Sequence, residues 1–163
     1  MIKLIAAVGK NMELGKKGKL IWQLKGDMAF FKTQTIGHIV IMGANTFRSL
    51  PKKLSNRIHY VLTTGSVKQS NDGSVKVFSN LDKLIEEVKN LAKKQNVFVV
   101  GGENIYKLFI DLADEILLTE IDAEDVCADV FFPCFDKSKY TRYVIFSNEE
   151  NGIKYTHVKY TRT

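Results

Sequence analysis

The residue best suited to chemistry in this sequence is Asp27, a carboxylate set among apolar and aromatic residues. It follows the only tryptophan, Trp22, and precedes the pair Phe30-Phe31. If Gly26 opens a helix, Asp27 lies in its first turn and Phe31 lies one turn further on the same face. Desolvation by such neighbours raises the pKa of a carboxyl group, whereas a helix N-terminus lowers it.

Two roles fit Asp27 on sequence grounds. The carboxylate can cap its own helix, which is a common structural use of aspartate. It can also face a pocket and accept two hydrogen bonds from a planar heterocycle that carries a ring N–H beside an amino group, a bidentate and charge-assisted geometry. The residues around Asp27 leave both roles open.

Three apolar strand patterns end in glycine or hydroxyl residues. They are Val97–Val100 before Gly101-Gly102, Ile39–Met42 before Gly43, and Ile58–Thr63 before Thr64-Gly65. Glycine lets the backbone approach a ligand, helix N-termini attract phosphate, and open α/β sheets bind ligands beyond the carboxyl ends of their strands. The three ends together predict a groove for a nucleotide or another phosphate-bearing ligand. Each alone could be a tight turn that binds nothing, since no standard nucleotide motif is present.

An alternation of strands and helices must position these residues. Further strand patterns occur at Ile2–Val8, Val75–Phe78 and Glu115–Ile121, and helical patterns at Leu81–Lys94, at about Glu103–Leu112 and, in shorter form, after Asp27 and Ala44. Asn80 is the expected N-cap of the Leu81 helix. Arg142–Phe146 and Ile153–Tyr160 alternate in polarity and predict an antiparallel hairpin. The sequence therefore predicts one α/β domain over residues 1–163, with a mostly parallel central sheet and a C-terminal hairpin.

Composition narrows the classes of function. The net charge is +6, but the lysines are scattered and match no nucleic-acid-binding module, so we expect no nucleic-acid partner. No apolar run approaches the roughly 20 residues of a membrane span, and we expect a cytoplasmic monomer. Cys127 and Cys134 read as reduced packing thiols. His38, His59 and His157 lack metal-ligand spacing, so we assign them no catalytic role and expect no metal.

Motifs in a fixed order over the whole chain carry a family resemblance. They are Leu4-Ile5-Ala6-Ala7, Gly15, Leu20-Ile21-Trp22, Asp27, Phe30-Phe31-Lys32, Val40-Ile41-Met42-Gly43, Thr46, Arg57, Val100-Gly101-Gly102, Tyr106, and Leu118-Thr119 with Ile121. In this order they resemble dihydrofolate reductases. The resemblance implies a three-layer fold with helices on both faces of the sheet. It also implies NADPH-dependent reduction of 7,8-dihydrofolate to 5,6,7,8-tetrahydrofolate.

The resemblance also implies a role for each matching residue. Asp27 would bind the pterin and promote protonation at N5, Thr119 would hydrogen-bond Asp27, Trp22 would cover the site, and Arg57 would bind the glutamate α-carboxylate. The substrate pocket would be lined by Ile5, Ala6, Met28, Phe31, Leu50, Leu54 and Val100. The cofactor would be held by Ala7, Leu14, Gly15, Gly43, Asn45, Thr46, Thr63, Thr64, Lys76, Gly101, Gly102, Glu103, Asn104, Ile105 and Tyr106. Gly101-Gly102 would be joined by a cis peptide, and residues 9–21 would form a mobile lid.

The sequence departs from the family pattern in the lid and in the phosphate-binding positions. Ile21 and Lys25 replace frequent prolines, and Ala128 replaces a glycine before Asp129. Ala44 and Asn104 stand where basic residues are common, which weakens the preference for NADPH over NADH. The alternatives are a related reductase that acts on a pyrimidine intermediate of riboflavin synthesis, and a basic nucleotide- or RNA-binding module.

Overall fold

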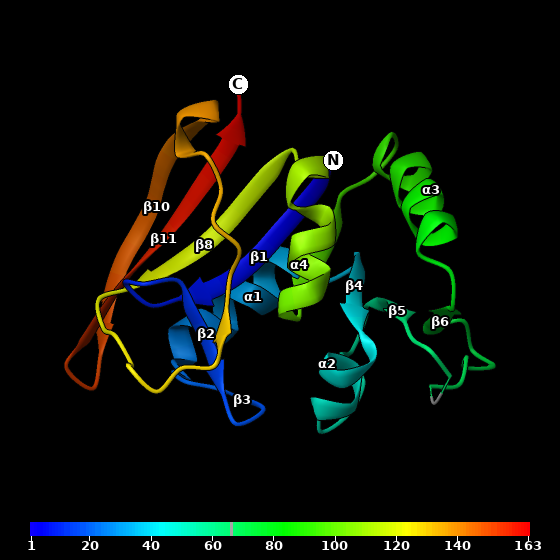
Figure 1. The fold of residues 1–163 in the computed structure, drawn as a ribbon, viewed down its shortest axis with the longest axis horizontal. Coiled ribbons are helices and arrows are strands. Elements are labelled where there is room, and N and C mark those ends of the chain that lie inside the picture. Colours follow the sequence, from blue (N-terminus) through cyan, green and yellow to red (C-terminus); the bar gives the residue numbers. More distant parts are fainter. Residues whose placement is uncertain (66) are drawn as a thin grey trace.

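The chain forms an eight-stranded sheet in a computed structural model that describes residues 1–65 and 67–163 (Figure 1). The spatial order of the strands is β10-β11-β8-β1-β7-β4-β5-β6. Their bounds are β1 Ile2–Val8, β4 Ile39–Gly43, β5 Ile58–Leu62, β6 Val75–Phe78, β7 Val97–Gly101, β8 Glu115–Ile121, β10 Tyr140–Glu150 and β11 Ile153–Arg162. The strands from β8 to β6 in this order are parallel, while β11 is antiparallel to β8, and β10 is antiparallel to β11. The predicted α/β fold class, with its C-terminal hairpin, is confirmed.

Four α-helices connect the strands. They are α1 Lys25–Thr35, α2 Ala44–Ser49, α3 Leu81–Ala92 and α4 Glu103–Phe109, and the 3₁₀ turn Ile110–Leu112 continues α4. The Asn80 side chain accepts a 3.1 Å hydrogen bond from the Lys83 N–H, which confirms the predicted cap. The predicted helices at residues 81 and 103 are right in kind, but their ends differ from the prediction. α3 ends at Ala92, two residues before the predicted Lys94, and α4 ends at Phe109, where the predicted helix continues as a 3₁₀ turn.

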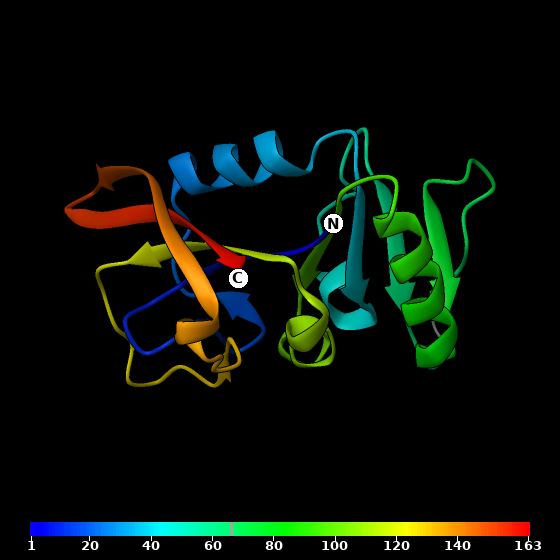
Figure 2. The ribbon, with the colours of Figure 1, turned by 90° about the horizontal axis from the view of Figure 1, so that it is seen from above.

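The helices cover both faces of the sheet. Figure 2 shows α1 on one side of the sheet and α3 and α4 on the other. Apolar residues of α3 and α4 pack on β1 and β7 in one core cluster, which includes Leu84, Val88, Ile105, Phe109, Leu4 and Val99. A second cluster joins Phe30 of α1 to Val40 and Met42 of β4. Because both faces are covered, the central strands are apolar along their whole length rather than alternating.

A small second sheet was not predicted. It pairs β2 Glu13–Lys16 with β3 Lys19–Leu20 and β9 Val130–Phe131, where the sequence indicated only a lid loop. Lys17 and Gly18 turn between β2 and β3 with φ of 51° and 77°. Strands this short carry little periodicity, and β9 comes from far along the chain, so no local pattern could reveal the pairing.

The structure overturns the prediction for the two cysteines. Cys127 and Cys134 are free and exposed, so the prediction of packing thiols is wrong. Every helix in the described ranges falls short of the length and hydrophobicity that a membrane-spanning helix needs. In the same ranges, no group of three or more His, Cys, Asp or Glu side chains is arranged to hold a metal ion.

The N-terminus of α1 is capped from another element. Glu150, at the end of β10, accepts hydrogen bonds from the backbone N–H of Lys25 at 2.8 Å and of Gly26 at 2.6 Å. The Tyr155 hydroxyl also donates to Glu150 at 2.6 Å. Gly26 is required here, because a Cβ at this position would lie 2.1 Å from the Tyr155 hydroxyl. The hairpin therefore fixes the start of the helix that carries Asp27.

The cap yields a stability prediction. Glu150→Ala leaves the first N–H groups of α1 without their acceptor, so we expect Tm to fall by about 2–4 °C. Glu149→Ala is the matched control, since the side chain of Glu149 is exposed and is outside the cap. Thermal unfolding followed by circular dichroism measures both variants. Equal Tm values for the two would contradict the cap.

Candidate active site

Asp27 lies in the first turn of α1 and reaches over β8. Its Oδ1 accepts a 2.5 Å hydrogen bond from the Thr119 hydroxyl, and its side chain is 22% exposed. Burial raises the pKa of Asp27, the hydrogen bond from Thr119 lowers it, and the negative charge of Glu150 raises it further. The net shift is upward, so this carboxyl holds its proton more firmly than a solvated aspartate does.

The structure resolves the two roles that the sequence left open for Asp27. The N-cap residue of α1 is Leu24, which makes no side-chain cap, and Glu150 supplies the acceptor in its place. Within the described part of the chain, no protein donor lies within hydrogen-bond distance of Asp27 Oδ2. Asp27 therefore presents a partly buried acceptor rather than serving its own helix.

Most of the predicted substrate-lining residues belong to the apolar cluster that packs against α1, the helix that carries Asp27. Ile5 is buried, whereas the predicted lining residues Ala6, Phe31, Leu50, Leu54 and Val100 are only partly buried. All but Ala6 belong to the core cluster on the α1 side of the sheet. Met28 is different, since it is 62% exposed. The structure thus brings most of the predicted substrate pocket together on one side of the sheet and leaves Met28 at its outer margin.

Arg57 is nearly buried, with 7% of its surface exposed. Its Nη1 donates to the Thr35 hydroxyl at 3.1 Å and its Nε donates to the Ser55 carbonyl at 3.0 Å, while the guanidinium lies 6.0 Å from the Phe31 ring centroid. Burial lowers the pKa of Arg57. No carboxylate of the described residues forms an ion pair with it. It also lines a hollow of about 490 Å³, together with Leu54 and Asp72.

The glycine-bearing strand ends meet as predicted. β7, β4 and β5 are neighbours in the sheet, and the Gly101–Gly102 peptide is cis, as the resemblance implied. Gly101 has φ of 121°, and a Cβ there would lie 3.3 Å from the Tyr106 ring. Tyr106 is buried and its hydroxyl donates to the Ile5 carbonyl at 2.7 Å. A Cβ on Gly102 would lie 3.3 Å from the Thr46 hydroxyl, so this edge brings backbone very close to α2.

Other predicted cofactor residues lie along or beside this edge. Thr63 is buried directly after β5, and its hydroxyl accepts from the Gly65 N–H at 3.2 Å, while Thr64 is exposed. Lys76 on β6 is already paired, since its ammonium lies 2.6 Å from Glu87 of α3. The remaining predicted cofactor residues lie on four elements. Asn45 lies at the start of α2, and Glu103, Asn104 and Ile105 lie at the start of α4. Ala7 lies on β1, and Leu14 and Gly15 lie on β2.

Comparison with known proteins agrees with this geometry. A family model described as dihydrofolate reductase matches residues 1–162. The chain is 36% identical over 153 residues to a dihydrofolate reductase of Heliothis virescens, covering 85% of this chain and 82% of that protein. The chain belongs to the dihydrofolate reductase family. It is also 35% identical over 140 residues to a dihydrofolate reductase of Bacillus subtilis, covering 86% and 80% of the two chains.

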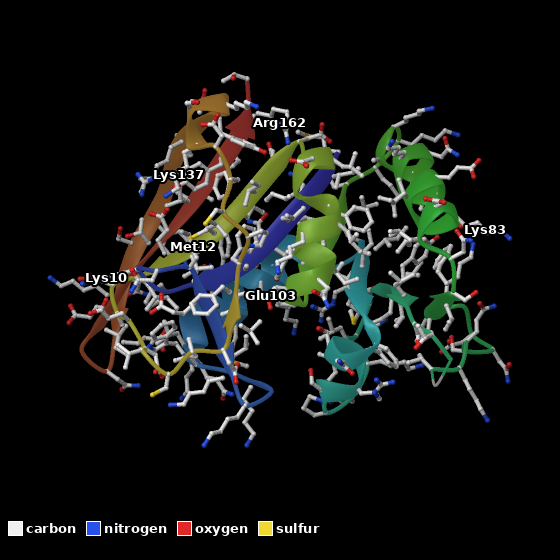
Figure 3. The ribbon with its side chains drawn as sticks, in the orientation of Figure 1. Lys10, Met12, Lys83, Glu103, Lys137 and Arg162 are labelled. Atoms are coloured by element: carbon white, nitrogen blue, oxygen red, sulfur yellow. The ribbon has the colours of Figure 1, made fainter. Side chains whose placement is uncertain are left out.

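In this dihydrofolate reductase fold, the lid segment, residues 9–21, is held by the loop that follows β8. The buried side chain of Glu13 accepts from the Asn11 N–H at 2.6 Å and from the Asp125 N–H at 2.8 Å. Asp129 accepts from the Lys17 N–H at 3.0 Å. Figure 3 shows Met12 on the same segment, where its carbonyl accepts from the Phe132 N–H at 2.9 Å. These bonds attach residues 9–21 to Asp125, Asp129 and Phe132.

Trp22 follows the lid and packs against it. A Cβ on Gly9 would lie 2.5 Å from the Trp22 ring. The ring also packs on the small cluster formed by Leu24, Ile121 and Tyr155. The structure thus places Trp22 against residues 9–21, and its role in covering the site stays a prediction.

Sequence reasoning missed two residues of the site. Glu150 belongs to a hairpin that the sequence assigned only to closing the sheet edge, and His157 was given no role. His157 is fully buried, and its Nδ1 lies 2.8 Å from Thr119 Oγ1. The available signals were a charged residue near the hairpin turn and a histidine on the same face as Tyr155 in an alternating strand, but neither signal indicates the partner of the residue.

Lid attachment is testable by hydrogen exchange. Each carboxylate oxygen of Glu13 accepts from one backbone N–H, that of Asn11 or that of Asp125. In Glu13→Gln, an amide NH₂ group replaces one of these oxygens, so one of the two N–H groups loses its acceptor. We expect the amides of Asn11 and Asp125 to exchange about 10- to 100-fold faster, from a cost of roughly 1–3 kcal/mol. Glu124→Gln is the control, because Glu124 only accepts from the exposed Asn11 side chain at 3.1 Å. Unchanged exchange in Glu13→Gln would show that the lid is held by other contacts.

Proposed function

We propose that this protein reduces 7,8-dihydrofolate to 5,6,7,8-tetrahydrofolate, with NADPH as the hydride donor. The observation that carries the proposal is the carboxylate of Asp27, which is held at Oδ1 by Thr119 and has no protein donor at Oδ2 among the described residues, on the helix that packs on the apolar cluster of Phe30, Phe31 and Ile5. A pterin ring offers adjacent N–H and amino donors to such an acid. The membership of the chain in the family supports the same activity.

In this proposal, the protein binds, orients and protects the substrate. Asp27 accepts the two pterin hydrogen bonds and, by stabilising positive charge on the ring, promotes protonation at N5. The partly buried side chains of Phe31, Leu50 and Leu54 exclude water from the ring and its aryl extension. Arg57, held by Thr35 and Ser55, presents a guanidinium to the glutamate α-carboxylate. Trp22 and the lid segment cover the site.

The strand ends fit a nicotinamide cofactor. Gly43, Gly101 and Gly102 leave space that a Cβ would fill, at 3.2 to 3.3 Å from neighbouring side chains. α2 and α4 begin beside these glycines, and neither N-cap residue supplies a side-chain acceptor to the first N–H groups. These N–H groups, with the hydroxyls of Thr46, Thr63 and Thr64, are suited to phosphate. When bound there, the cofactor supplies the hydride for C6.

The role of Asp27 predicts a pH-dependent loss of activity. Asp27→Asn keeps the shape of the side chain but removes its charge, so we expect kcat to fall by about 10²- to 10⁴-fold at neutral pH. The loss should shrink in acid, where solvent protonates N5 without help. The wild type loses its carboxylate on acidification at a higher pH than a solvated aspartate would, because burial raises its pKa. Steady-state rates from acid to alkaline pH test this, and equal losses at every pH would refute the role.

The cofactor preference is a separate prediction. The 2′-phosphate of NADPH forms charge-assisted hydrogen bonds of about 1.5–3 kcal/mol each, so one such bond gives at least a tenfold preference over NADH. We expect kcat/KM with NADPH to exceed that with NADH by this factor or more. The assay follows dihydrofolate reduction with each cofactor side by side. Equal values would show that Ala44, Asn104 and the paired Lys76 leave the 2′-phosphate unrecognised.

We further propose that residues 1–163 act as a single-domain, cytoplasmic monomer with no nucleic-acid partner. The scattered distribution of the lysines supports the last point. Size-exclusion chromatography with light scattering measures the mass. RNA binding titrated against salt would reveal a steep salt dependence if the basic surface bound phosphates.

A further inference from the structure

His157 stands directly beside the acceptor system of Asp27. β11 pairs antiparallel with β8, and in that register His157 is opposite Thr119. Side chains of directly opposite residues share a face of the sheet and lie in contact. His157 Nδ1 is 2.8 Å from Thr119 Oγ1 and 4.0 Å from Asp27 Oδ1, and the histidine has no exposed surface. Three polar side chains from β11, β8 and α1 thus form one chain of contacts.

Aromatic rings enclose the rest of the histidine. Phe30 of α1 stacks on it with ring centroids 4.0 Å apart and an interplanar angle of 24°. Phe146 lies 4.4 Å away and Tyr155 5.5 Å away. A β-bulge in β10, between Val144 and Phe146, places Phe146 opposite His157. Nε2 has no hydrogen-bond partner among residues 1–65 and 67–163. The ring therefore has one polar contact, and that contact is with Thr119.

The number of hydrogens on each group determines which atom donates in the His157–Thr119 and Thr119–Asp27 hydrogen bonds. The Thr119 hydroxyl has one hydrogen, and an ionised Asp27 can only accept, so that hydrogen goes to Asp27 Oδ1. Thr119 Oγ1 is then an acceptor toward His157, which must carry its hydrogen on Nδ1. The opposite tautomer would place an N–H on the enclosed Nε2, where nothing accepts it, and such a buried donor is costly. Burial lowers the pKa of His157 to about 4, so the ring is neutral at neutral pH.

We propose that His157 is a positioning residue of the active site that acts through Thr119. By donating from Nδ1, it commits the Thr119 hydroxyl to donate to Asp27 Oδ1 and leaves Oδ2 to the substrate. Because the Thr119 hydroxyl keeps donating to Oδ1, a proton taken up by Asp27 must go to Oδ2, and the bond at Oδ1, polarised by His157, is stronger to the charged carboxylate than to the neutral acid. The arrangement therefore favours the ionised carboxylate that pterin recognition requires.

Three other ionisable residues interact electrostatically with Asp27, namely Glu150, Tyr106 and Tyr155. Glu150 acts on Asp27 and raises its pKa by charge repulsion. Tyr106 and Tyr155 also lie near enough for the charge of Asp27 to raise their own pKa values, so both are neutral at neutral pH. None of these three donates to Thr119. The direct donor to the hydroxyl is His157.

Two substitutions separate hydrogen bonding from packing. His157→Phe keeps an aromatic ring against Phe30 but removes the donor. His157→Asn loses the ring but can place an N–H near the position of Nδ1. We expect His157→Phe to raise the pKa of Asp27 in the ligand-free protein by about half a unit, from the loss of cooperative polarisation of the Thr119 bond. His157→Asn should restore most of the wild-type pKa.

The primary measurement is the titration of the Asp27 carboxyl carbon by NMR in the ligand-free protein. Tyr160→Phe is the control, because it removes another buried hydroxyl of β11, whose partner is Glu120 at 2.6 Å, and should leave the pKa of Asp27 unchanged. In a Thr119→Val background, His157→Phe should have no further effect, since the connecting hydroxyl is gone. An unchanged pKa of Asp27 in His157→Phe, or an equal shift caused by His157→Phe in the wild-type and Thr119→Val backgrounds, would overturn the proposal.

Turnover gives a second readout, and this part rests on the proposed function. The acid limb of the kcat/KM profile for dihydrofolate should move upward by the same half unit in His157→Phe and return in His157→Asn. If the wild type does not reduce dihydrofolate, the proposed function fails while the NMR titration still decides the role of His157. If the wild type is active and the limb stays fixed in His157→Phe, the inference fails alone.

Discussion

The hydrogen bond between Thr119 and Asp27 is the contact on which the rest of the site depends. It joins the first turn of α1 to the middle of the sheet and holds a carboxylate where burial opposes its charge. A lone carboxylate at a helix N-terminus would ordinarily turn back and cap the helix. Here Glu150 has taken over that task from the hairpin. Glu150 therefore caps the helix, and Asp27 keeps Oδ2 as an acceptor without a donor from the described residues.

The sequence predicted the parts of the fold that depend on local pattern. The continuous apolar strands, the Asn80 cap and the alternating hairpin were all visible in the order of residue types, because burial on two faces, capping and half-burial each leave a local signature. The assembly of β7, β4 and β5 at one edge also followed, since parallel strands place their carboxyl ends together. The family resemblance then supplied what no single pattern could, namely the pairing of Asp27 with Thr119.

What the sequence could not predict depends on long-range pairing. β9 pairs with β2 although each is too short to show periodicity. Glu150 meets α1 only because the hairpin extends to residue 150, further than its alternating pattern indicated. His157 looked like an ordinary strand residue until the β8–β11 register placed it opposite Thr119. A shift of one residue in that register would turn it to the other face of the sheet.

The hairpin formed by β10 and β11 has a further consequence for how the protein is made. Its residues cap the helix that carries Asp27 and supply the histidine behind Thr119, yet they come last in the chain. β8 and α1 are synthesised much earlier, and during synthesis the edge of β8 that β11 will cover stays open. The acid site can therefore take its final form only once the C-terminal strands have left the ribosome. The residues that complete the acid site therefore follow β8 and α1 in the order of synthesis.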